Sequence, residues 1–321
     1  MTFTEELRQK IDAGLDITRE EALALVNVPL EELTAAANEL RAQMCGNRFD
    51  LCTIVNGKCG KCSEDCKYCA QSAYYHTDCE ETYPLLPTEV LLAGARHNKE
   101  QGVRRYSIVT SGKRLSDKEI EAVCESISEI RRQVGIEVCV SFGLLEERQF
   151  DKIRKAGASR VHCNLESSRR FFPQICTTHT YDEKLAALRA AKSAGLSLCS
   201  GGIMGLGETM EDRIDMALDI RALGVKSIPV NLLNPIKGTP FEKNPILSGD
   251  VFCRILAIYR FLIPDGDIRL AGGRGLVGDQ GERCFRSGAN AAISGDMLTT
   301  AGITVATDLA LVKKLGYEVI L

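Results

Sequence analysis

The sequence lacks long apolar runs, an excess of charge of one sign, internal repeats and low-complexity tracts. No stretch reaches the roughly 18 apolar residues that a transmembrane helix needs. The first residues, MTFTEELRQKIDAG, hold no apolar signal-peptide core. The formal net charge is only −3 over 321 residues, which is atypical of a general nucleic-acid binder or a membrane-surface protein. We therefore expect a cytoplasmic protein that binds neither nucleic acid nor membrane.

Cysteine is the one residue that is unusually frequent. Hydrophobic residues make up 45% and charged residues 26% of the chain, as in ordinary globular proteins. The chain has 14 cysteines, and a cytosolic protein normally keeps its thiols reduced. Metal ligation or redox chemistry is therefore expected before disulfides. Scattered cysteines in helical patterns, such as Cys124 and Cys253, are expected to be small buried apolar residues.

Short apolar runs alternate with amphipathic stretches along most of the chain. Residues 1–48 are predicted to form an N-terminal helical extension, with a capping-box start at Thr18. Eight apolar runs follow, at 51–55, 105–109, 136–142, 159–165, 195–203, 225–232, 267–271 and 289–293. Strand–helix alternation makes a parallel sheet. Residues 49–321 are therefore predicted to form an α/β fold, a (β/α)8 TIM-type barrel, with an open doubly wound sheet as the alternative.

A cysteine motif follows the first predicted strand. Cys62, Cys66 and Cys69 form a CxxxCxxC pattern, and in a barrel this position lies among the loops that carry the chemistry. Three thiolates can hold three corners of a cubane iron–sulfur cluster and leave one iron open. Zinc is the alternative, although structural zinc usually takes four ligands. Cys59 is a candidate for the fourth.

Several further motifs, in order along the chain, extend this pattern. They are Asn56-Gly57-Lys58, CSEDCKYCAQS (62–72), Asn164-Leu165-Glu166, CSGGIMGLGET (199–209), Asn231-Leu232-Leu233, KGTP (237–240), IRLAGGR (268–274) and SGAN (287–290). Together they resemble the biotin synthase family of the radical S-adenosylmethionine (SAM) superfamily. The resemblance covers roughly residues 40–315.

The resemblance implies a sulfur-inserting enzyme. Cys62, Cys66 and Cys69 would ligate a [4Fe–4S] cluster, and SAM would bind the open iron. An electron from a flavodoxin or ferredoxin would cleave SAM to methionine and a 5′-deoxyadenosyl radical. That radical would abstract hydrogens from dethiobiotin, and two new C–S bonds would give biotin. The family also implies a homodimer.

The resemblance further assigns residues to SAM. Tyr68 would lie against the adenine. Asn164 and Glu166 share parity on the fourth predicted strand, so both can point inward toward the ribose. The glycines of CSGGIMGLGE, Gly201 and Gly202, would let the backbone approach the ligand closely. His179 stands where the family usually has an Arg that binds the SAM carboxylate, and a neutral imidazole is a poorer carboxylate partner.

Dethiobiotin would take a second group of side chains. Asn231 on the sixth predicted strand, together with Asn164, would bind the ureido ring, which carries both donors and acceptors. Thr299 and Thr300 would meet the substrate's carboxylate. The alternative for the threonine pair is a helix N-cap.

The second cluster is the point where this sequence departs from the family pattern. The family's auxiliary [2Fe–2S] cluster, the sulfur donor, is held by three cysteines and an Arg. The matching positions here are Ser107, Cys139, Cys199 and Arg269, and serine is a poor substitute for a soft thiolate. Cys52, on the neighbouring first strand, is the predicted replacement.

The predicted auxiliary cluster is therefore held by Cys52, Cys139 and Cys199, on the first, third and fifth strands. Alternate barrel strands contribute to the same interior layer, and three thiolates suit three corners of a cubane. We therefore expect four irons rather than a [2Fe–2S] cluster, with the open iron free for sulfide, solvent or Arg269. Cys176 is kept as a reserve ligand.

Two alternatives to biotin synthase remain at this point. One is a related radical SAM enzyme of the same barrel type, such as a hydrogenase-maturation or pyrrolysine-pathway enzyme. Asn164, Asn231 and Arg269 argue against it. The other is a non-catalytic iron–sulfur or zinc protein, which explains the cysteine motif but not the inward-facing polar residues on several strands.

Overall fold

The computed structural model describes residues 1–77 and 81–320. Its strands are β1 Arg48–Lys58, β2 Arg105–Thr110, β3 Glu137–Ser141, β4 Arg160–His162, β5 Ser197–Cys199, β6 Gly202–Met204, β7 Ser227–Leu232, β8 Asp267–Leu270, β9 Ala291–Ser294 and β10 Glu318–Val319. Its α-helices are α1 Phe3–Asp12, α2 Arg19–Ala24, α3 Leu30–Cys45, α4 Thr88–Glu100, α5 Asp117–Gln133, α6 Glu147–Ala156, α7 Tyr181–Ser193, α8 Met210–Ala222, α9 Gly249–Leu262, α10 Glu282–Phe285 and α11 Val305–Lys314. The 3₁₀ turns are η1 Leu25–Asn27, η2 Phe172–Gln174 and η3 Arg274–Val277.

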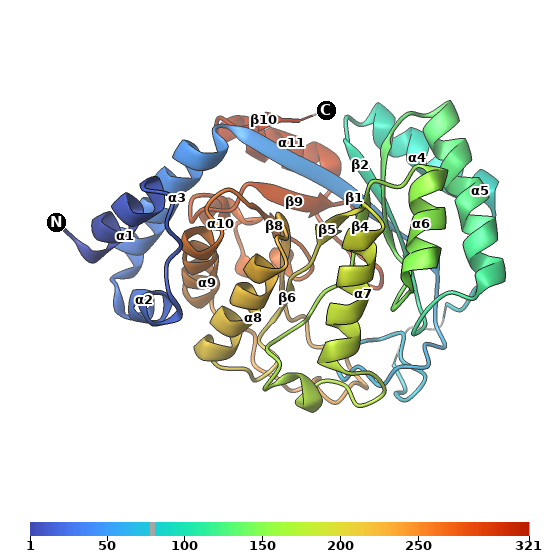
Figure 1. Cartoon of the computed structure of the whole chain (residues 1–321), viewed down its shortest axis with the longest axis horizontal. Coiled ribbons are helices and arrows are strands. Elements are labelled where there is room, and N and C mark those ends of the chain that lie inside the picture. The colour runs from blue at the N-terminus through green and yellow to red at the C-terminus, as the bar shows by residue number, and fades with distance from the viewer. Residues whose placement is uncertain (78–80, 321) are drawn as a thin grey trace.

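The strands form a closed barrel surrounded by helices (Figure 1). Neighbouring strands are parallel in the order β1-β2-β3-β4-β5-β7-β8-β9, and β9 pairs back onto β1. In that closing ladder Asp50 lies opposite Ala291, and Cys52 lies opposite Ile293. The predicted TIM-type barrel is therefore confirmed, and the open sheet is excluded.

Each of the eight apolar runs contains a strand at the predicted position. The run at 195–203 is split into β5 and β6, which both pair with β7. The short β10 pairs with the outer end of β1. Because a barrel strand is buried on both faces, such runs are continuously apolar rather than alternating, and this is why they could be located from the sequence.

Side-chain caps define where many helices begin. Thr18 accepts from the Glu21 backbone while the Glu21 carboxylate accepts from the Thr18 backbone, so the predicted capping box is confirmed. The same reciprocal arrangement starts α5, α7 and α8. Gly157 ends α6 with φ = 113°, a conformation that residues with a Cβ rarely adopt. These local signals determine where the helices begin and end between successive strands.

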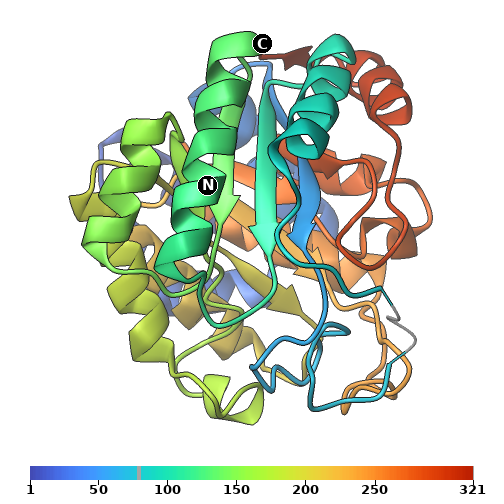
Figure 2. The ribbon, with the colours of Figure 1, turned by 90° about the vertical axis from the view of Figure 1, so that its right-hand side faces the viewer.

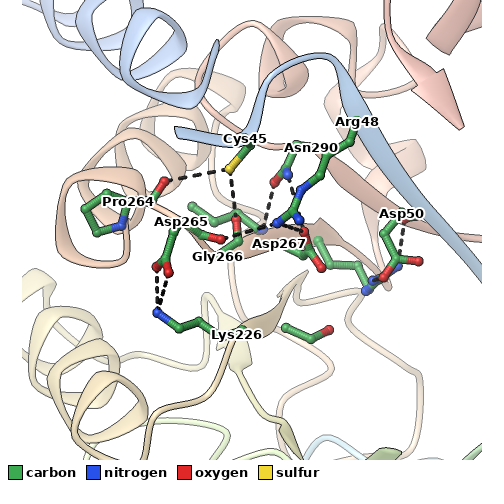
Figure 3. Close-up of polar contacts among 12 residues, drawn as sticks. Cys45, Arg48, Asp50, Lys226, Pro264, Asp265, Gly266, Asp267 and Asn290 are labelled. Atoms are coloured by element: carbon green, nitrogen blue, oxygen red, sulfur yellow. Dashed lines mark hydrogen bonds and ion pairs between the residues drawn. The ribbon is translucent and has the colours of Figure 1, made fainter. Parts of the chain in front are cut away.

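The N-terminal helices are attached to the barrel at the N-terminal ends of its strands. Helix α3 packs against α9. At the end of α3, the Cys45 thiol lies 3.7 Å from the Pro264 carbonyl oxygen and 3.8 Å from that of Gly266. Arg48 pairs with Asp267 at 3.1 Å (Figure 3). The domain boundary near residue 48 stays a prediction.

The opposite end of the barrel carries the long connections. Figure 2 shows the described part of the segment between β1 and α4 lying beyond the ends toward which the strand arrows point. This segment holds the CxxxCxxC motif. Among residues 1–77 and 81–320, no helix combines the length and apolarity needed to cross a membrane.

Candidate active site

A cavity of about 410 Å³ runs from the CxxxCxxC segment into the barrel. We call its outer part, beside Cys62, Cys66 and Cys69, the cavity mouth, and its inner part, beside Cys52 and Arg269, the cavity floor. The predicted site residues that line it are Cys52, Cys62, Cys66, Tyr68, Cys69, Cys139, Asn164, Glu166, His179, Cys199, Asn231, Arg269, Thr299 and Thr300. One cavity therefore connects residues that are up to about 250 positions apart.

Hydrogen bonds tie the CxxxCxxC segment to other loops at the mouth. The Asp65 carboxylate accepts hydrogen bonds from the backbone N–H groups of Thr177 (2.8 Å) and Thr178 (3.2 Å). Burial alone would raise the pKa of Asp65, but a hydrogen bond from the Thr177 hydroxyl together with these backbone bonds lowers it below its ordinary range. The Gly112 N–H donates to Cys62 Sγ at 3.3 Å. Backbone N–H bonds of this kind stabilise a cluster-bound thiolate.

Cys176 lies at the mouth rather than at the floor. Its Sγ lies 3.1 Å from Asp65 Oδ1 and 3.3 Å from His179 Nδ1. The ligating atoms of Cys66, Cys176 and His179 all lie within 4.8 Å of one another. Cys176 therefore neighbours the first cysteine motif, and its role as a reserve ligand stays a prediction.

His179 is committed to an acidic partner. Its Nδ1 lies 2.7 Å from Glu64 Oε2, and both side chains are buried. Glu64 also accepts from Ser63 and Thr178. These hydrogen bonds lower the pKa of Glu64, although its burial alone would raise it. The Nδ1 atom of the imidazole is thus already hydrogen-bonded to a carboxylate of the same chain.

The predicted ribose residues form a connected group. The Tyr68 hydroxyl donates to Glu166 Oε1 at 3.0 Å, while Glu166 Oε2 is buried and has no partner among the described residues. Asn164 Oδ1 accepts from the Gly201 N–H at 3.0 Å. Glu166 has φ = 70°, which is uncommon for a residue with a Cβ. A buried carboxylate oxygen without a donor indicates a ligand that supplies one.

The two glycines have a packing role that the sequence did not predict. Gly201 and Gly202 are absent from the cavity lining in the described part of the chain. A Cβ on Gly201 would come within 1.8 Å of the Pro229 carbonyl oxygen, and one on Gly202 within 2.5 Å of the Glu166 carbonyl oxygen. They let β4, β6 and β7 approach closely, and this closeness positions Glu166.

The predicted substrate residues lie along one side of the cavity. Asn231 on β7 donates to the Gly202 carbonyl at 3.1 Å and accepts from the Gly272 N–H at 2.9 Å. Its amide therefore bridges two backbone segments as well as lining the cavity. Thr299, which is exposed, and Thr300 lie at the rim.

Three thiols meet at the cavity floor. Cys52, Cys139 and Cys199 are buried on β1, β3 and β5. Arg269 Nη1 donates to Cys52 Sγ at 3.2 Å, and Arg269 Nη2 lies 2.9 Å from Asp50 Oδ2. The cavity brings together the residues predicted to hold the auxiliary cluster, and their ligand role stays a prediction.

Three floor residues were not predicted from the sequence. His162 Nδ1 lies 3.4 Å from Cys199 Sγ, and Arg160 Nη1 lies 3.4 Å from Asp50 Oδ2. The sequence signal that could have found them is parity. Arg160 and His162 on β4 share the parity of Asn164, two residues after β4, and Asp50 shares that of Cys52 on β1. A charged residue within an apolar barrel strand also indicates a partner in the barrel interior, because a buried charge must be paired.

Among the three floor cysteines, the surrounding charge favours the thiolate form of Cys199 alone. Burial raises the pKa of Cys52 and of Cys139 above the ordinary thiol value. Burial acts in the same direction on Cys199, but His162 and the nearby guanidiniums lower its pKa to about 7. The Cys199 thiol therefore loses its proton most readily, and metal binding would displace the other two protons.

The residues present fit two iron–sulfur clusters. Each end of the cavity offers three thiols, the donor type that holds such clusters. At the floor, the Nε atoms of Arg105, Arg160 and Arg269 are buried and have no hydrogen-bond partner among the described residues. Buried donors facing thiols fit an anionic guest such as a thiolate-ligated cluster.

Comparison with known families agrees with this geometry. The radical SAM superfamily matches residues 58–220, and the Biotin and Thiamin Synthesis associated domain matches residues 229–318. The biotin synthase of Akkermansia muciniphila is 57% identical over 319 residues, which cover 99% of this chain and 99% of that protein. The chain belongs to the biotin synthase family.

Other members of the biotin synthase family are similarly close. Biotin synthase 2 of Corynebacterium diphtheriae is 55% identical and covers 100% of this chain and 97% of its own length. The biotin synthase of Brachyspira hyodysenteriae is 56% identical over 98% of this chain and 94% of its own length. Family membership confirms the predicted enzyme class, a sulfur-inserting radical SAM enzyme, over the related-enzyme and non-catalytic alternatives.

Solved structures show the same fold at low identity. Methylornithine synthase has a TM-score of 0.83 at 19% identity, covering 98% of this chain and 97% of its own. HydG, a maturase of the [FeFe]-hydrogenase, has a TM-score of 0.83 at 20% identity, covering 99% of this chain and 75% of its own. Family membership confirms the expected cofactors, namely a [4Fe–4S] cluster, SAM and an auxiliary iron–sulfur cluster. The iron count of the auxiliary cluster stays a prediction.

Proposed function

We propose that this protein converts dethiobiotin to biotin by inserting one sulfur atom. The observation that carries the proposal is the presence of two separate thiol triads in one cavity of a biotin synthase family member. One triad lies at the mouth and the other at the floor, so a substrate bound between them can meet both. When bound, the clusters and SAM supply one-electron cleavage, a carbon-centred radical and sulfur.

Cys62, Cys66 and Cys69 hold the SAM-binding cluster in this proposal. The rigid anchoring of Asp65 by Thr177 and Thr178 supports it, because a fixed loop keeps the three thiols in place.

Tyr68, Asn164 and Glu166 take the adenosine part of SAM. Tyr68 orients Glu166 through Oε1, which leaves Oε2 to accept from a ribose hydroxyl. The Asn164 carbonyl is held by Gly201, so its NH₂ group is the end that can turn to a ligand. Gly201 and Gly202 act on SAM indirectly, by allowing the strands to close around Glu166.

Asn231, Asn164, Thr299 and Thr300 position dethiobiotin. Asn231 and Asn164 present amides on adjacent parts of the cavity wall, which suits a ureido group with both donors and acceptors. Thr299 and Thr300 at the rim suit the carboxylate end. Such an orientation places the carbon chain across the cavity, between the two triads.

Cys52, Cys139 and Cys199 hold the auxiliary cluster, and four irons are favoured over two. Arg105, Arg160 and Arg269 outnumber the carboxylates near them. Asp50 bridges Arg160 and Arg269. Glu137, 3.9 Å from Arg105, is also bound by Arg131.

This excess of positive charge at the floor has a consequence for the cluster. It stabilises an anionic guest in a low-dielectric interior. Cys52, Cys139 and Cys199 would hold a three-thiolate cubane in this positively charged environment, and such a cluster would supply the sulfur for insertion. A flavodoxin or ferredoxin donor, a homodimer and a cytoplasmic location complete the proposal, supported by family resemblance alone.

An anaerobic assay tests the proposal. The reconstituted protein is given dethiobiotin, SAM and a reducing system, and biotin and 5′-deoxyadenosine are measured by mass spectrometry. We expect both products, with biotin absent when dethiobiotin is omitted. Production of 5′-deoxyadenosine without biotin would contradict the proposed substrate. A protein that does not cleave SAM at all would contradict the radical SAM assignment at the mouth.

A further inference from the structure

Two side chains from neighbouring strands contact the Cys199 sulfur at the cavity floor. His162 Nδ1 lies 3.4 Å from Cys199 Sγ, and the Ser227 hydroxyl lies 3.2 Å from it. The β4–β5 ladder pairs His162 with Cys199, so the two side chains stand on the same face of the barrel wall. His162 also lines the cavity. The backbone register therefore places the imidazole beside this thiol.

The direction of the bond between His162 and Cys199 follows from the state of the thiol. A thiol must lose its proton to bind iron, and a thiolate can only accept a hydrogen bond. With Cys199 bound to a cluster, the N–H of His162 Nδ1 is therefore the donor. Among residues 1–77 and 81–320, no hydrogen bond reaches His162 Nε2. Within that part of the chain, Cys199 is thus the hydrogen-bond partner that orients this imidazole.

His162 differs from other basic side chains of the cavity, because no described residue gives it an acidic partner. Arg160 pairs with Asp50 at 3.4 Å. His179, the other imidazole that lines the cavity, is hydrogen-bonded to Glu64 at 2.7 Å. The hydrogen bond of His162 goes to sulfur instead. Its N–H group is therefore available to a thiolate rather than committed to a carboxylate.

We propose that His162 donates a hydrogen bond to the Cys199 sulfur when Cys199 ligates the auxiliary cluster, and that this bond raises the reduction potential of the cluster. The inference rests on the auxiliary cluster of the proposed function. It makes His162 a positioning residue, which acts through a ligand and is not a ligand itself.

The physical basis is the negative charge that a cluster gains on reduction. A hydrogen bond to a ligating sulfur stabilises this charge, and hydrogen bonds to the sulfurs are among the factors that set cluster potentials. The effect is larger in a low-dielectric interior than in water. Cys199 is only 6% exposed, so water competes little for its sulfur. Removing the His162 donor should therefore make the auxiliary cluster harder to reduce.

The test measures the potential of the auxiliary cluster in the cluster-loaded enzyme. Wild type, His162→Leu, His162→Asn and His97→Leu are reconstituted anaerobically, and iron and sulfide are counted in each. Redox titrations are followed by EPR, and the SAM cluster is recognised by its spectral change when SAM is added. Leu removes the donor, whereas the Asn amide keeps an N–H group near the position of Nδ1. His97, an exposed histidine on α4 that contacts Gln101, is the matched control.

His162→Leu should lower the auxiliary potential. At the wild-type midpoint, the ratio of reduced to oxidised auxiliary cluster should fall roughly 3- to 10-fold, the range for one lost hydrogen bond. His162→Asn should recover most of that ratio, and His97→Leu should match wild type. The potential of the SAM cluster should not change in any variant, because His162 lies at the floor and the SAM cluster at the mouth.

A second measurement uses the wild-type protein and decides the question even if His162→Leu does not take up its auxiliary cluster. Protein labelled with ¹⁵N-histidine is reduced, and its auxiliary-cluster signal is recorded by pulsed EPR. A weak ¹⁵N coupling is expected for a nitrogen that reaches iron only through the N–H···S bond, and labelled His162→Asn should lack it. A strong coupling, as from a nitrogen bound directly to iron, would make His162 a ligand and overturn the inference.

An unchanged auxiliary potential in fully loaded His162→Leu would also overturn the inference. So would an equal fall in His162→Leu and His162→Asn, because packing of the ring rather than its donor would then set the potential. Failure of the proposed function has a different signature. A wild type whose auxiliary potential depends on His162 but which makes no biotin would contradict the substrate and leave the His162 assignment standing. A wild type without a second cluster would contradict both.

Discussion

Arg269 Nη1 donates a hydrogen bond to Cys52 Sγ across 3.2 Å, although the two residues are 217 positions apart. Arg269 stands on β8 and Cys52 on β1, and the strand between them, β9, pairs with both. The same guanidinium is held by Asp50. The thiol predicted to replace the missing cluster ligand is therefore hydrogen-bonded to the arginine that is predicted to serve the same cluster.

The Cys52–Arg269 contact predicts the effect of two substitutions. Cys52→Ser should abolish biotin formation and the auxiliary-cluster spectrum but keep SAM cleavage, because serine is a poor ligand for the cluster irons. Ser107→Ala should be nearly silent, because the proposed ligand set does not include Ser107. Absorbance, EPR and product analysis of both variants check this. Loss of the cluster in Ser107→Ala with its retention in Cys52→Ser would mean that the ligand assignment is reversed.

Anaerobic iron and sulfide counting tests the nuclearity at the same time. Two cubanes require about eight irons per chain, and one cubane with a two-iron cluster about six. We expect a value near eight in the wild type and near four in Cys52→Ala, because only the auxiliary cluster is lost. A wild-type count near six would favour an altered two-iron centre.

Substitution of the mouth cysteines should abolish SAM cleavage without affecting the auxiliary cluster at the floor. Single Ala substitutions of Cys62, Cys66 and Cys69 should each abolish formation of 5′-deoxyadenosine, because a cluster deprived of one thiolate no longer presents its open iron to SAM correctly. The auxiliary-cluster spectrum should persist. Cys124→Ala, on the surface side of α5, is the control and should retain both. SAM cleavage near the wild-type rate in any of the three variants would remove that cysteine from the ligand set.

Asn231→Ala should raise the dethiobiotin concentration needed for half-maximal rate. Losing an interior polar partner typically costs about 1–3 kcal/mol, or roughly 5- to 150-fold in binding. SAM affinity should not change. Asn244→Ala is a matched control, because the Asn244 amide also donates to a backbone carbonyl, that of Gly205, but lies outside the cavity lining. Equal loss of affinity for both ligands would move Asn231 to the SAM site.

Asp212 should make stability depend on pH. Its buried carboxylate accepts from Ser168 Oγ at 2.5 Å, from the Thr209 N–H at 2.9 Å and from Arg170. Burial alone would raise its pKa, but these bonds lower the pKa below the ordinary value. The folded pKa is therefore below the unfolded one. Ionised Asp212 therefore makes its full contribution to the free energy of unfolding above the unfolded pKa, near 4. That contribution is lost as pH falls through the folded pKa.

Asp212→Asn tests that dependence. It should lower the free energy of unfolding by about 1–3 kcal/mol at neutral pH, and the difference from wild type should shrink between about pH 5 and pH 3. Urea unfolding of both proteins across this range measures it. Asp12→Asn, an exposed change, should show little difference at any pH. A constant difference from pH 7 to pH 3 would show that the ionised carboxylate is not what stabilises α8.

Local patterns were sufficient to predict the repeating elements. Thr18 and Glu21, three residues apart, predicted a helix start, because a capping box closes within one turn. The spacing of Cys62, Cys66 and Cys69 likewise predicted a cluster-binding segment at the end of the first strand. The members of each pattern lie within a few positions of one another along the chain, so the sequence alone limits the distances between them.

Long-range partners could be anticipated only through parity and family resemblance. Cys52 was found in this way, because a thiol on an inward position of β1 must face the barrel interior. His162 and Arg160 carried the same signal and were missed. The glycines at 201 and 202 were assigned to SAM, whereas steric contact with Pro229 and Glu166 explains why they have no side chain.

The sequence by itself determined the alternation of strands and helices, the helix caps and the thiol triad Cys62, Cys66 and Cys69. Only the tertiary structure decided that β9 closes onto β1, that His179 contacts Glu64, and that Arg269 reaches Cys52. The physical reason is the range of the interactions involved. Turns and caps form between residues a few positions apart, whereas charge pairing at the site depends on which distant strands and loops the closed barrel brings together.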